Sequence, residues 1–189
     1  MSLSSPHAPD TGFPYVARPD ARVLILGSMP SVASLGATQY YAHPRNAFWP
    51  IMGELFHFDA SLPYDKRLEK LRECGIALWD VVHRCHRPGS MDSSIETDSV
   101  EINDFKGFFA RHPQIETVFF NGGTAERLFR RMVFVTLPEP LSKLPMKRLP
   151  STSPAHAARG FHQKLESWRA IRRALDASGA ASTDTPPDP

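Results

Sequence analysis

The chain alternates between short runs of consecutive apolar residues and longer stretches in which apolar residues recur at helical spacing. Continuous apolar runs are typical of strands that are buried on both faces of a sheet. They predict strands in 22–27, 76–82 and 115–123. We also expect a short fourth strand and a turn in 146–156.

Helical spacing predicts helices between and after these strands. Asn46 is placed to cap the first helix, Gly75 to end the second and Pro113 to end the third. Strands that alternate with helices favour a parallel sheet with helices on both faces, which is an α/β fold. The helices are expected in 46–56, 64–75, 103–112, 124–132 and 161–177.

The segment 27–50 follows the first strand and shows no steady period. It is rich in aromatic and hydrogen-bonding side chains and is expected to be a loop. The ends of the other predicted strands are also polar, and read DVVHRC, FNGG and PSTSPAH. Ligands of parallel α/β sheets bind beyond the carboxyl ends of the strands, so we expect the chemistry of this chain at that edge.

The composition is that of a soluble globular protein, with 41% hydrophobic and 22% charged residues in a chain of 189. We expect one domain in 21–177, between an N-terminal surface arm in 1–20 and a disordered tail in 178–189. No apolar run approaches the roughly 20 residues of a membrane span, and the first residues lack the pattern of a secretion signal. Two cysteines cannot build a disulfide framework, so a cytoplasmic location is expected.

The net charge of +2 hides an uneven distribution of charged residues. Residues 127–176 contain 11 Lys and Arg against 3 Asp and Glu, whereas the rest of the chain contains 11 against 17. A basic segment of this kind is typical of a surface that contacts phosphates. Charge alone slightly favours the other interpretation, a solvated helix face.

Five short motifs resemble those of the uracil-DNA glycosylase superfamily, in particular its hypoxanthine-DNA glycosylase branch. They are GSMPS at 27–31, YYAHPRNAFW at 40–49, LWDVVHRC at 78–85, FFNGGTAERLF at 119–129 and STSPAHAARGF at 151–161. The resemblance covers 22–175, and AHPRNAFW is its most specific part. It implies a three-layer α/β/α fold around a four-stranded parallel sheet, with a DNA-binding groove along the carboxyl edge of the strands.

The resemblance implies a monofunctional DNA glycosylase of base excision repair, which hydrolyses the N-glycosidic bond of a deaminated base and leaves an abasic site. Hypoxanthine is the first expected substrate and uracil the second. We expect a monomer that acts on DNA containing the damaged base, with no cofactor and no membrane partner. No Lys lies in these motifs to act as a Schiff-base nucleophile, so a lyase step is not expected.

A glycosylase takes its target base out of the stack and into a pocket. Tyr41 stands where relatives place a stacking aromatic residue, and Tyr40 and Phe48 are alternatives. Asp80 stands where many relatives carry an Asn that reads the base. It can accept from a ring N–H, donate if it is protonated, or merely cap a turn. The residues expected to contact the base are Gly27, Ser28, Met29, Tyr41, Asp80 and Asn121.

The expected catalytic residue departs from the pattern of several superfamily branches. Those branches carry a polar catalytic residue where this chain has Met29, which can neither orient water nor polarise a bond. The branch that this chain resembles uses the Asn of HPRN, here Asn46, whose carboxamide can hold water or support charge on the departing base. From the residues alone, Asn46 is interpreted as a helix cap. With the resemblance it is expected to be catalytic, and both roles are compatible.

The final motif is expected to contact the DNA. Ser151 replaces a His of the relatives, and Ala155 replaces the bulky residue that fills the emptied base stack. His156 is one candidate for that second task. Hydroxyl and backbone N–H groups of this motif can bind phosphates, as can the basic residues around it. The expected DNA contacts are Ser151, Thr152, Ser153, His156, Lys147, Arg148 and Arg159.

Two other functions stay open at this point. The chain can be a damaged-DNA-binding domain without catalysis, which Met29 and Ser151 would permit. It can also be a hydrolase of free nucleosides, which would not need the basic segment. His83, His86 and Cys74 match no common zinc pattern, so no metal site is expected.

Overall fold

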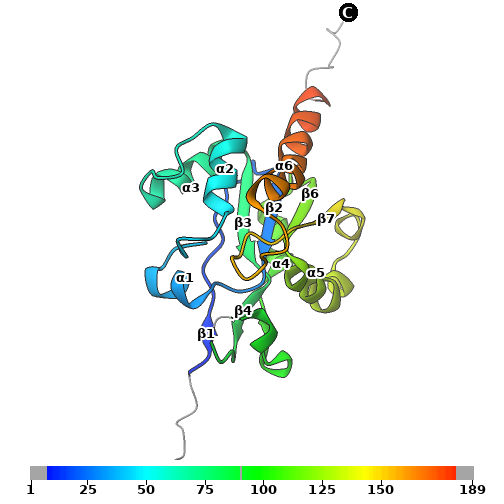
Figure 1. The fold of residues 1–189 in the computed structure, drawn as a ribbon. Coiled ribbons are helices and arrows are strands. Elements are labelled where there is room, and N and C mark those ends of the chain that lie inside the picture. The colour runs from blue at the N-terminus through cyan, green and yellow to red at the C-terminus, as the bar shows by residue number, and fades with distance from the viewer. Residues whose placement is uncertain (1–7, 90, 182–189) are drawn as a thin grey trace, which may run out of the picture.

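A computed structural model describes residues 8–89 and 91–181 of the chain (Figure 1). Its centre is a four-stranded parallel sheet in which β2 lies between β3 and β6. The strand order reverses beside β2, which is the place where sheets of this kind bind their ligands. In spatial order the strands are β3 (Ile76–Asp80), β2 (Val23–Gly27), β6 (Thr117–Asn121) and β7 (Met146–Leu149).

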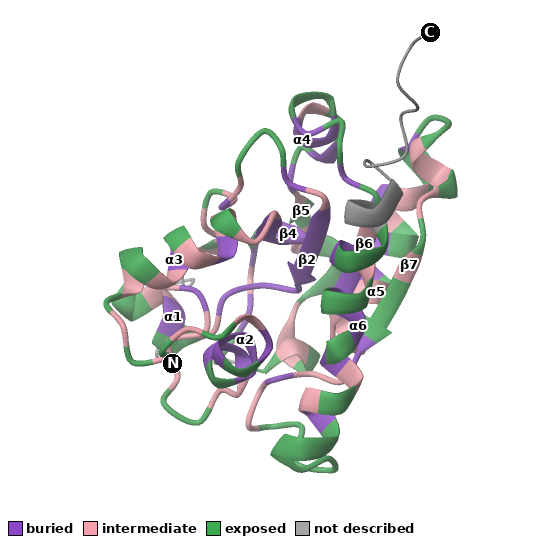
Figure 2. Ribbon diagram, turned by 90° about the horizontal axis from the view of Figure 1, so that it is seen from above, coloured by how far each residue is buried: buried purple, intermediate pink, exposed green. Residues whose placement is uncertain are grey.

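Alternate residues of the strands point to opposite faces of the sheet and enter two apolar cores. Val23 and Ile25 belong to one core, and Leu24 and Leu26 belong to the other. The central strand β2 is buried along its length, whereas the edge strand β7 is largely exposed (Figure 2). The predicted three-layer α/β/α fold is confirmed. The first core is covered by α2 (Phe48–Phe56), α3 (Tyr64–Glu73) and α6 (Phe161–Ala181), and the second by α4 (Phe105–Arg111) and α5 (Gly123–Leu128).

A second, antiparallel sheet extends the fold beyond the predicted strands. The strand predicted in 76–82 ends at Asp80, and the chain continues through Val81 into β4. The exposed His83 and Arg84 interrupt the apolar pattern of β4, which is why the sequence did not reveal it. In spatial order the strands of this sheet are β1 (Asp10–Thr11), β4 (Val82–Cys85) and β5 (Glu101–Ile102).

The ends of the domain differ from the predicted boundaries. Val16 is 7% exposed and exchanges two backbone hydrogen bonds with Leu78, at 2.9 and 2.8 Å. The expected surface arm is therefore part of the folded core from β1 onwards, while 1–7 lie outside the described residues. Helix α6 continues four residues past 177, to Ala181. The remainder of the expected tail, 182–189, also lies outside the described residues.

The segment 27–50, predicted as a loop, contains the short helix α1 (Val32–Ala37). Ser31 caps it, because its Oγ accepts a hydrogen bond from the Ser34 N–H at 3.2 Å. Val32 is 53% exposed, so α1 has no apolar stripe that periodicity could reveal. The helix predicted in 124–132 is divided into α5 and a π turn. Irregular turns lie at Phe129–Val133, Phe134–Thr136, Asp92–Ser94, Thr97–Ser99 and Leu141–Lys143.

None of the helices in 8–89 and 91–181 has the length and apolar character needed to cross a bilayer.

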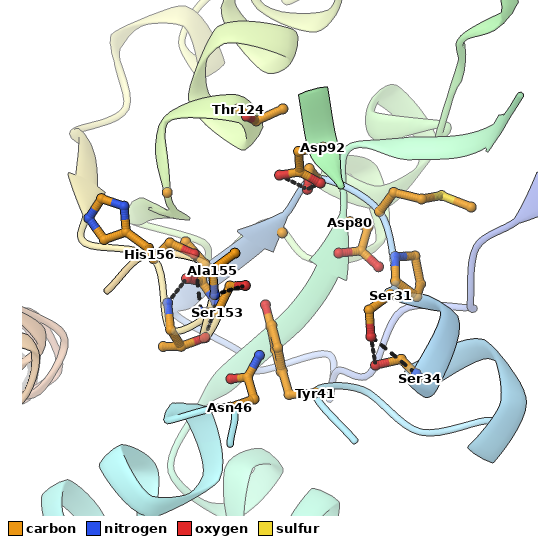
Figure 3. Close-up of a pocket in the computed structure, with 18 of the residues that line it drawn as sticks. Ser31, Ser34, Tyr41, Asn46, Asp80, Asp92, Thr124, Ser153, Ala155 and His156 are labelled. Carbon is orange, nitrogen blue, oxygen red and sulfur yellow. Dashed lines mark hydrogen bonds between the residues drawn. The ribbon is translucent and has the colours of Figure 1, made fainter. Parts of the chain in front are cut away.

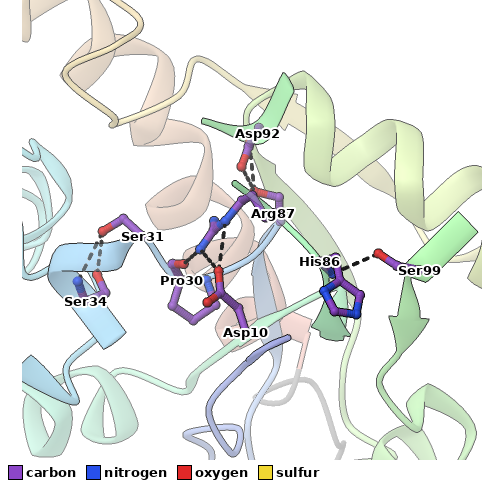
Figure 4. Close-up of polar contacts among 9 residues, drawn as sticks. Asp10, Pro30, Ser31, Ser34, His86, Arg87, Asp92 and Ser99 are labelled. Atoms are coloured by element: carbon purple, nitrogen blue, oxygen red, sulfur yellow. Dashed lines mark hydrogen bonds and ion pairs between the residues drawn. The ribbon is translucent and has the colours of Figure 1, made fainter. Parts of the chain in front are cut away.

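Arg87 joins the N-terminal strand to the loop after β2 (Figure 4). Its side chain is fully buried, and Nη2 donates to Asp10 Oδ2 at 2.9 Å and to the Pro30 carbonyl oxygen at 2.6 Å. Nε lies 3.3 Å from the same Asp10 oxygen. A buried guanidinium is stable only beside its counter-ion. Asp10 therefore helps to hold the beginning of the 27–50 segment in place through Arg87.

We predict that Asp10→Ala lowers the free energy of unfolding by about 3 kcal/mol or more, because it leaves the buried Arg87 charge without its partner. The double variant Asp10→Ala/Arg87→Met should recover part of this loss, since Met fills the space without a charge. Chemical denaturation of both variants measures the two effects. Equal stability of the wild type and Asp10→Ala would show that the ion pair does not secure the N-terminal strand.

Candidate active site

A cleft of about 310 Å³ opens at the carboxyl edge of the sheet. Its walls come from the segments after all four parallel strands, from the loop around Tyr41 and from the turn at Asp92. In Figure 3, Asp80 and Asp92 lie across this space from Tyr41 and Asn46. The cleft brings together these predicted site residues: Gly27, Ser28, Met29, Tyr41, Asn46, Asp80, Asn121, Ser151, Thr152, Ser153 and His156.

Tyr41 forms an aromatic wall of the cleft. Its ring is stacked on Phe48, with the ring centroids 4.0 Å apart and an angle of 23° between the planes. Phe48 is fully buried beneath Tyr41 and does not line the cleft, whereas Tyr41 does (Figure 3). Tyr41 has a φ of 56°, a left-handed conformation that residues other than glycine seldom adopt. Such conformations concentrate at functional sites, where the surrounding structure enforces them.

Tyr40, one of the alternatives for base stacking, has a structural task. It is 2% exposed, and its Oη donates to the Pro14 carbonyl oxygen at 3.2 Å. Its N–H donates to Tyr64 Oη and its carbonyl oxygen accepts from Trp49 Nε1, both at 2.9 Å. These bonds fix the backbone beside Tyr41 and leave Tyr41 as the ring available to a ligand.

Asp80 ends β3 and is 3% exposed, yet its Oδ2 has no hydrogen-bond partner among the described residues. The carboxyl group lies over Gly27, its register partner on β2. A Cβ at Gly27 would collide with Asp80 Oδ1 and lie 3.2 Å from Tyr41 Oη, so glycine lets both oxygens occupy one corner of the cleft. Burial raises the pKa of Asp80 to about 8, with Asp92 adding to the rise and Arg87 opposing it. The carboxyl group is therefore mostly neutral at pH 7.

Tyr41 Oη is a second buried polar atom without a well-formed hydrogen bond among the described residues. Burial raises the pKa of Tyr41 far above its usual range, Asp80 adds to the rise, and the nearby Asn121 side chain opposes it. A cap on a turn would give the Asp80 carboxyl a backbone N–H partner, and the described residues supply none. Two unpaired buried oxygens side by side lower stability. Such a pair is typical of a site that completes its hydrogen bonds with a ligand.

Asn46 lies just before α2, and its Oδ1 accepts a hydrogen bond from the Phe48 N–H at 3.0 Å. Its own N–H donates to the His43 carbonyl oxygen at 2.8 Å, which fixes the backbone. Because the side-chain oxygen is used by the helix, the amide nitrogen is turned to the cleft (Figure 3). Asn46 can therefore cap α2 through its oxygen and donate to a ligand through its nitrogen.

The loop 150–156 is fixed to the sheet through Thr152. Asn121 Nδ2 donates to Thr152 Oγ1, and Asn121 Oδ1 accepts from the Thr152 N–H, both at 2.9 Å. The Thr152 carbonyl oxygen accepts from the Ala47 N–H at 3.0 Å, which ties this loop to the loop of Asn46. Thr152 is 1% exposed, so its predicted contact with DNA is corrected to a bracing role. Asn121 lines the cleft beside the Tyr41 hydroxyl.

Comparison with known proteins agrees with this arrangement. Residues 13–175 match the family described as the uracil DNA glycosylase superfamily. The chain belongs to this superfamily. A protein of Methanosarcina acetivorans named hypoxanthine DNA glycosylase is 38% identical over 167 residues, which are 86% of this chain and 97% of the relative. A protein of Methanosarcina barkeri with the same name is 39% identical over 129 residues, which are 66% of this chain and 80% of the relative.

A solved structure is similar to this superfamily member over most of its length. It is the solution NMR structure of a Methanosarcina acetivorans protein that was provisionally named a uracil DNA glycosylase. The match has a TM-score of 0.71 and 34% sequence identity, and it covers 89% of this chain and 99% of the other. The fold expected from the sequence is thus found in a solved relative.

The turn at Asp92, between β4 and β5, is a part of the site that sequence reasoning missed. Ser28 Oγ donates to the Asp92 carboxylate and lies 2.8 Å from each of its oxygens. The Ser28 hydroxyl is therefore engaged in holding this turn, while the contact of Ser28 with the base stays a prediction, since the residue lines the cleft. Burial raises the pKa of Asp92, and the Ser28 hydrogen bond and the Arg87 charge oppose the rise. A single Asp in a polar loop carries no motif that could have revealed it.

Met29 lines the cleft, and its contact with the base stays a prediction. Its side chain is 6% exposed and belongs to the apolar core beneath the cleft, so it limits the depth of the site without offering a polar group. Within the described part of the chain, no group of three or more His, Cys, Asp or Glu side chains is arranged to hold a metal ion.

The basic residues predicted to contact DNA lie outside the cleft. Lys147 and Arg148 are exposed on β7, where Arg148 Nε lies 3.5 Å from Glu126 Oε2. Arg159 lines a second groove of about 340 Å³ on the side of α6.

The second groove, which we call the basic groove, continues from the cleft, because Asn46 and His156 line both. Its cationic residues are Arg45, Arg159 and Lys164, and none of its described lining residues is acidic. Arg45 lies outside the basic segment found in the sequence. The structure therefore brings together cations from two distant parts of the chain.

We predict that Asp80 makes the protein less stable as the pH rises from its ordinary pKa of 3.8 to about 8. Below 3.8 the carboxyl group is protonated in both states, and the stability is fully present. Between the two values the unfolded chain loses this proton while the folded protein keeps it, so the unfolded state is progressively favoured. Asp80→Asn is neutral throughout and should show a smaller decrease. Thermal melting over this pH range tests this, and parallel curves for the two proteins would contradict it.

Proposed function

We propose that this chain is a DNA glycosylase that hydrolyses the N-glycosidic bond of hypoxanthine in DNA and leaves an abasic site in an intact strand. The observation that carries the proposal is the convergence, in one cleft, of a stacking ring, an amide N–H and two unpartnered buried oxygens. A planar base that has left the duplex can use all of these groups. The name of the two relatives supports hypoxanthine as the first substrate, and uracil is the second.

In this proposal the flipped base stacks on Tyr41 and turns its polar edge towards Asp80. Stacking of a base on an aromatic side chain contributes about 1–3 kcal/mol to binding. The base edge supplies partners for Asp80 Oδ2 and Tyr41 Oη, which have none among the described residues. Asn121 lines the same space. Binding thus relieves the cost of two unsatisfied buried groups.

Asn46 is the catalytic residue. The C1′–N bond stretches towards an oxocarbenium-like sugar, and water attacks C1′ as the base departs. An amide N–H that is already in position stabilises the polarised water or the charge that develops on the base. The hydrogen bond between Asn46 Oδ1 and the Phe48 N–H supplies this fixed position. The helix cap and the catalytic role are therefore parts of one arrangement.

The DNA strand on one side of the flipped nucleotide follows the basic groove past Arg45 and Arg159, and Lys147 and Arg148 meet phosphates on the other side. One chain supplies both surfaces, so the enzyme acts as a monomer. Lys164 Nζ donates to the Ser153 carbonyl oxygen at 3.3 Å, and the described cleft lining contains no Lys. A Schiff-base step therefore has no nucleophile, and the strand stays intact.

We predict that Asn46→Asp leaves α2 capped but slows base release from a deoxyinosine duplex on the order of a hundred- to a thousandfold. The aspartate oxygen can still accept from the Phe48 N–H, whereas the N–H donor is lost. Asn46→Ala loses both groups and should also be about 1 kcal/mol less stable. Single-turnover excision and thermal melting separate the two effects.

Asp104→Ala is the matched control for the Asn46 variants. Asp104 Oδ1 caps α4 by accepting from the Gly107 N–H at 2.9 Å, and it does not line the cleft. Its removal should lower stability by a similar amount and leave excision unchanged. Excision at near wild-type rate by Asn46→Asp would contradict the catalytic assignment. Tight binding of the duplex without any release by the wild type would instead indicate a binding domain without catalysis.

We predict that Arg45→Ala/Arg159→Ala flattens the slope of log affinity against log salt by roughly 0.7 to 0.9 for each phosphate that the variant no longer binds. Lys147→Ala/Arg148→Ala should act in the same direction on the other side of the cleft. Lys66→Ala/Lys70→Ala is the control, because these residues lie on α3 in ion pairs with Glu69 and Glu73. An unchanged slope in both test variants would show that these surfaces do not contact DNA.

A further inference from the structure

The Asp80 carboxyl group is the most unusual buried group in the cleft. It sits at the end of β3 with 3% exposure, and Oδ2 is buried without a partner among the described residues. A carboxylate in such a place needs a cation or several N–H donors to remain charged. The carboxyl group and the Tyr41 hydroxyl lie at one corner beside Gly27, and no ion pair of Asp80 with a cation is found among the described residues.

The charged and titratable groups around Asp80 come from three other segments. Asp92, from the turn between β4 and β5, disfavours the carboxylate form of Asp80. Arg87, which follows β4, favours it but is already paired with Asp10. Tyr40 and Tyr41, before α2, stay neutral because burial raises the pKa of each. Burial and these neighbouring groups together favour the protonated form of the Asp80 carboxyl, and Asp80 lines the cleft.

We propose that Asp80 is a general acid that protonates a ring nitrogen of the departing hypoxanthine. This inference rests on the proposed function, and it assigns to the cleft a second catalytic group besides Asn46. The two roles are distinct. Asp80 transfers a proton to the base, whereas Asn46 donates a hydrogen bond and transfers no proton. In this proposal Asp80 reaches the base because it lines the same cleft as Tyr41, the ring on which the base stacks.

The step balances without any further reactant. The C1′–N9 bond breaks, and its electron pair goes to the purine, while the Asp80 proton forms an N–H bond at N7 or N3. Hypoxanthine therefore leaves as a neutral molecule, and Asp80 becomes a carboxylate. The water oxygen forms the new bond to C1′ and loses one proton, which passes through the solvent and restores the acid.

This chemistry favours purines over uracil. A purine carries two ring nitrogens with free lone pairs, N3 and N7, which a carboxylic acid can protonate as the glycosidic bond breaks. The second ring nitrogen of uracil already carries a hydrogen, and only its carbonyl oxygens can accept. A neutral acid near the base therefore accelerates the release of hypoxanthine more than the release of uracil.

The test is the pH dependence of single-turnover release from a deoxyinosine duplex by the full chain. The wild-type rate should fall as the pH passes about 8, where Asp80 loses its proton. Asp80→Asn should be slower by about a hundred- to ten-thousandfold and should lack this fall. Asp92→Asn should keep the fall but move it to lower pH, because it removes the charge that raises the pKa of Asp80. A merely structural role of Asp80 would not move the profile in this way.

Duplexes with 7-deaza- or 3-deaza-deoxyinosine identify the receiving nitrogen. One of these analogues should lose the fall near pH 8, and Asp80→Asn should slow its release little further. The pH profiles of the wild type on these analogues test whether Asp80 protonates the base even if Asp80→Asn does not fold. A flat wild-type profile with normal release by Asp80→Asn would overturn the inference and leave the proposed function intact. If the wild type releases no hypoxanthine at any pH, the proposed function fails together with it.

Discussion

Gly27, at the end of β2, is the position on which the cleft depends. Asp80 is its register partner on β3, and the missing side chain leaves room for the Asp80 carboxyl and the Tyr41 hydroxyl at one spot. A methyl group there would collide with the carboxyl oxygen and displace it. The parallel register also places Asn121, at the end of β6, beside the same space. The pairing of three strands therefore decides which side chains can meet a ligand.

The site lowers the stability of the protein, and the surrounding structure compensates for this. Two buried oxygens, Asp80 Oδ2 and Tyr41 Oη, lack well-formed hydrogen bonds within the described part of the chain, and Tyr41 has a left-handed backbone. Each feature is unfavourable and persists only where neighbouring contacts leave no alternative. Those contacts are ties between loops: Asn121 to Thr152, Ser28 to Asp92, and Arg87 to Asp10 and Pro30. These hydrogen bonds and the ion pair fix the loops around the cleft relative to one another. The cleft is therefore preorganised for a base.

Three strands of the central layer, β2, β3 and β6, could be predicted because each contains a continuous apolar run, as in 22–27. The edge strand β7 is not such a run, because it contains Lys147 and Arg148. The superfamily and the three-layer architecture followed from the motifs, and both are confirmed. Helix α1 and strand β4 could not be predicted, because their exposed Val32, His83 and Arg84 break any periodicity. The cleft-lining residues were largely found, since the carboxyl ends of parallel strands meet at one edge.

The tasks of individual residues in the cleft were harder to predict than their positions. Ser28 is bonded to a residue 64 positions away, and Asn121 to one 31 positions away. No local sequence pattern reveals such distant partners. Both residues were therefore expected to contact the ligand and not another part of the chain. Asp80 differs from these two residues, because its Oδ2 has no hydrogen-bond partner among the described residues. That absence can be seen only in the folded chain. Contacts between distant segments thus separate bracing residues from those that remain available to a base.

The most direct test of the account is a panel of duplexes that each contain a single deaminated base. The full chain is incubated with each duplex, and the free base, the abasic sites and the strand breaks are quantified. The account predicts fastest release from the deoxyinosine duplex, one free hypoxanthine for each abasic site, and no strand breaks. Binding of this duplex without release of hypoxanthine, or release only from free deoxyinosine, would contradict it.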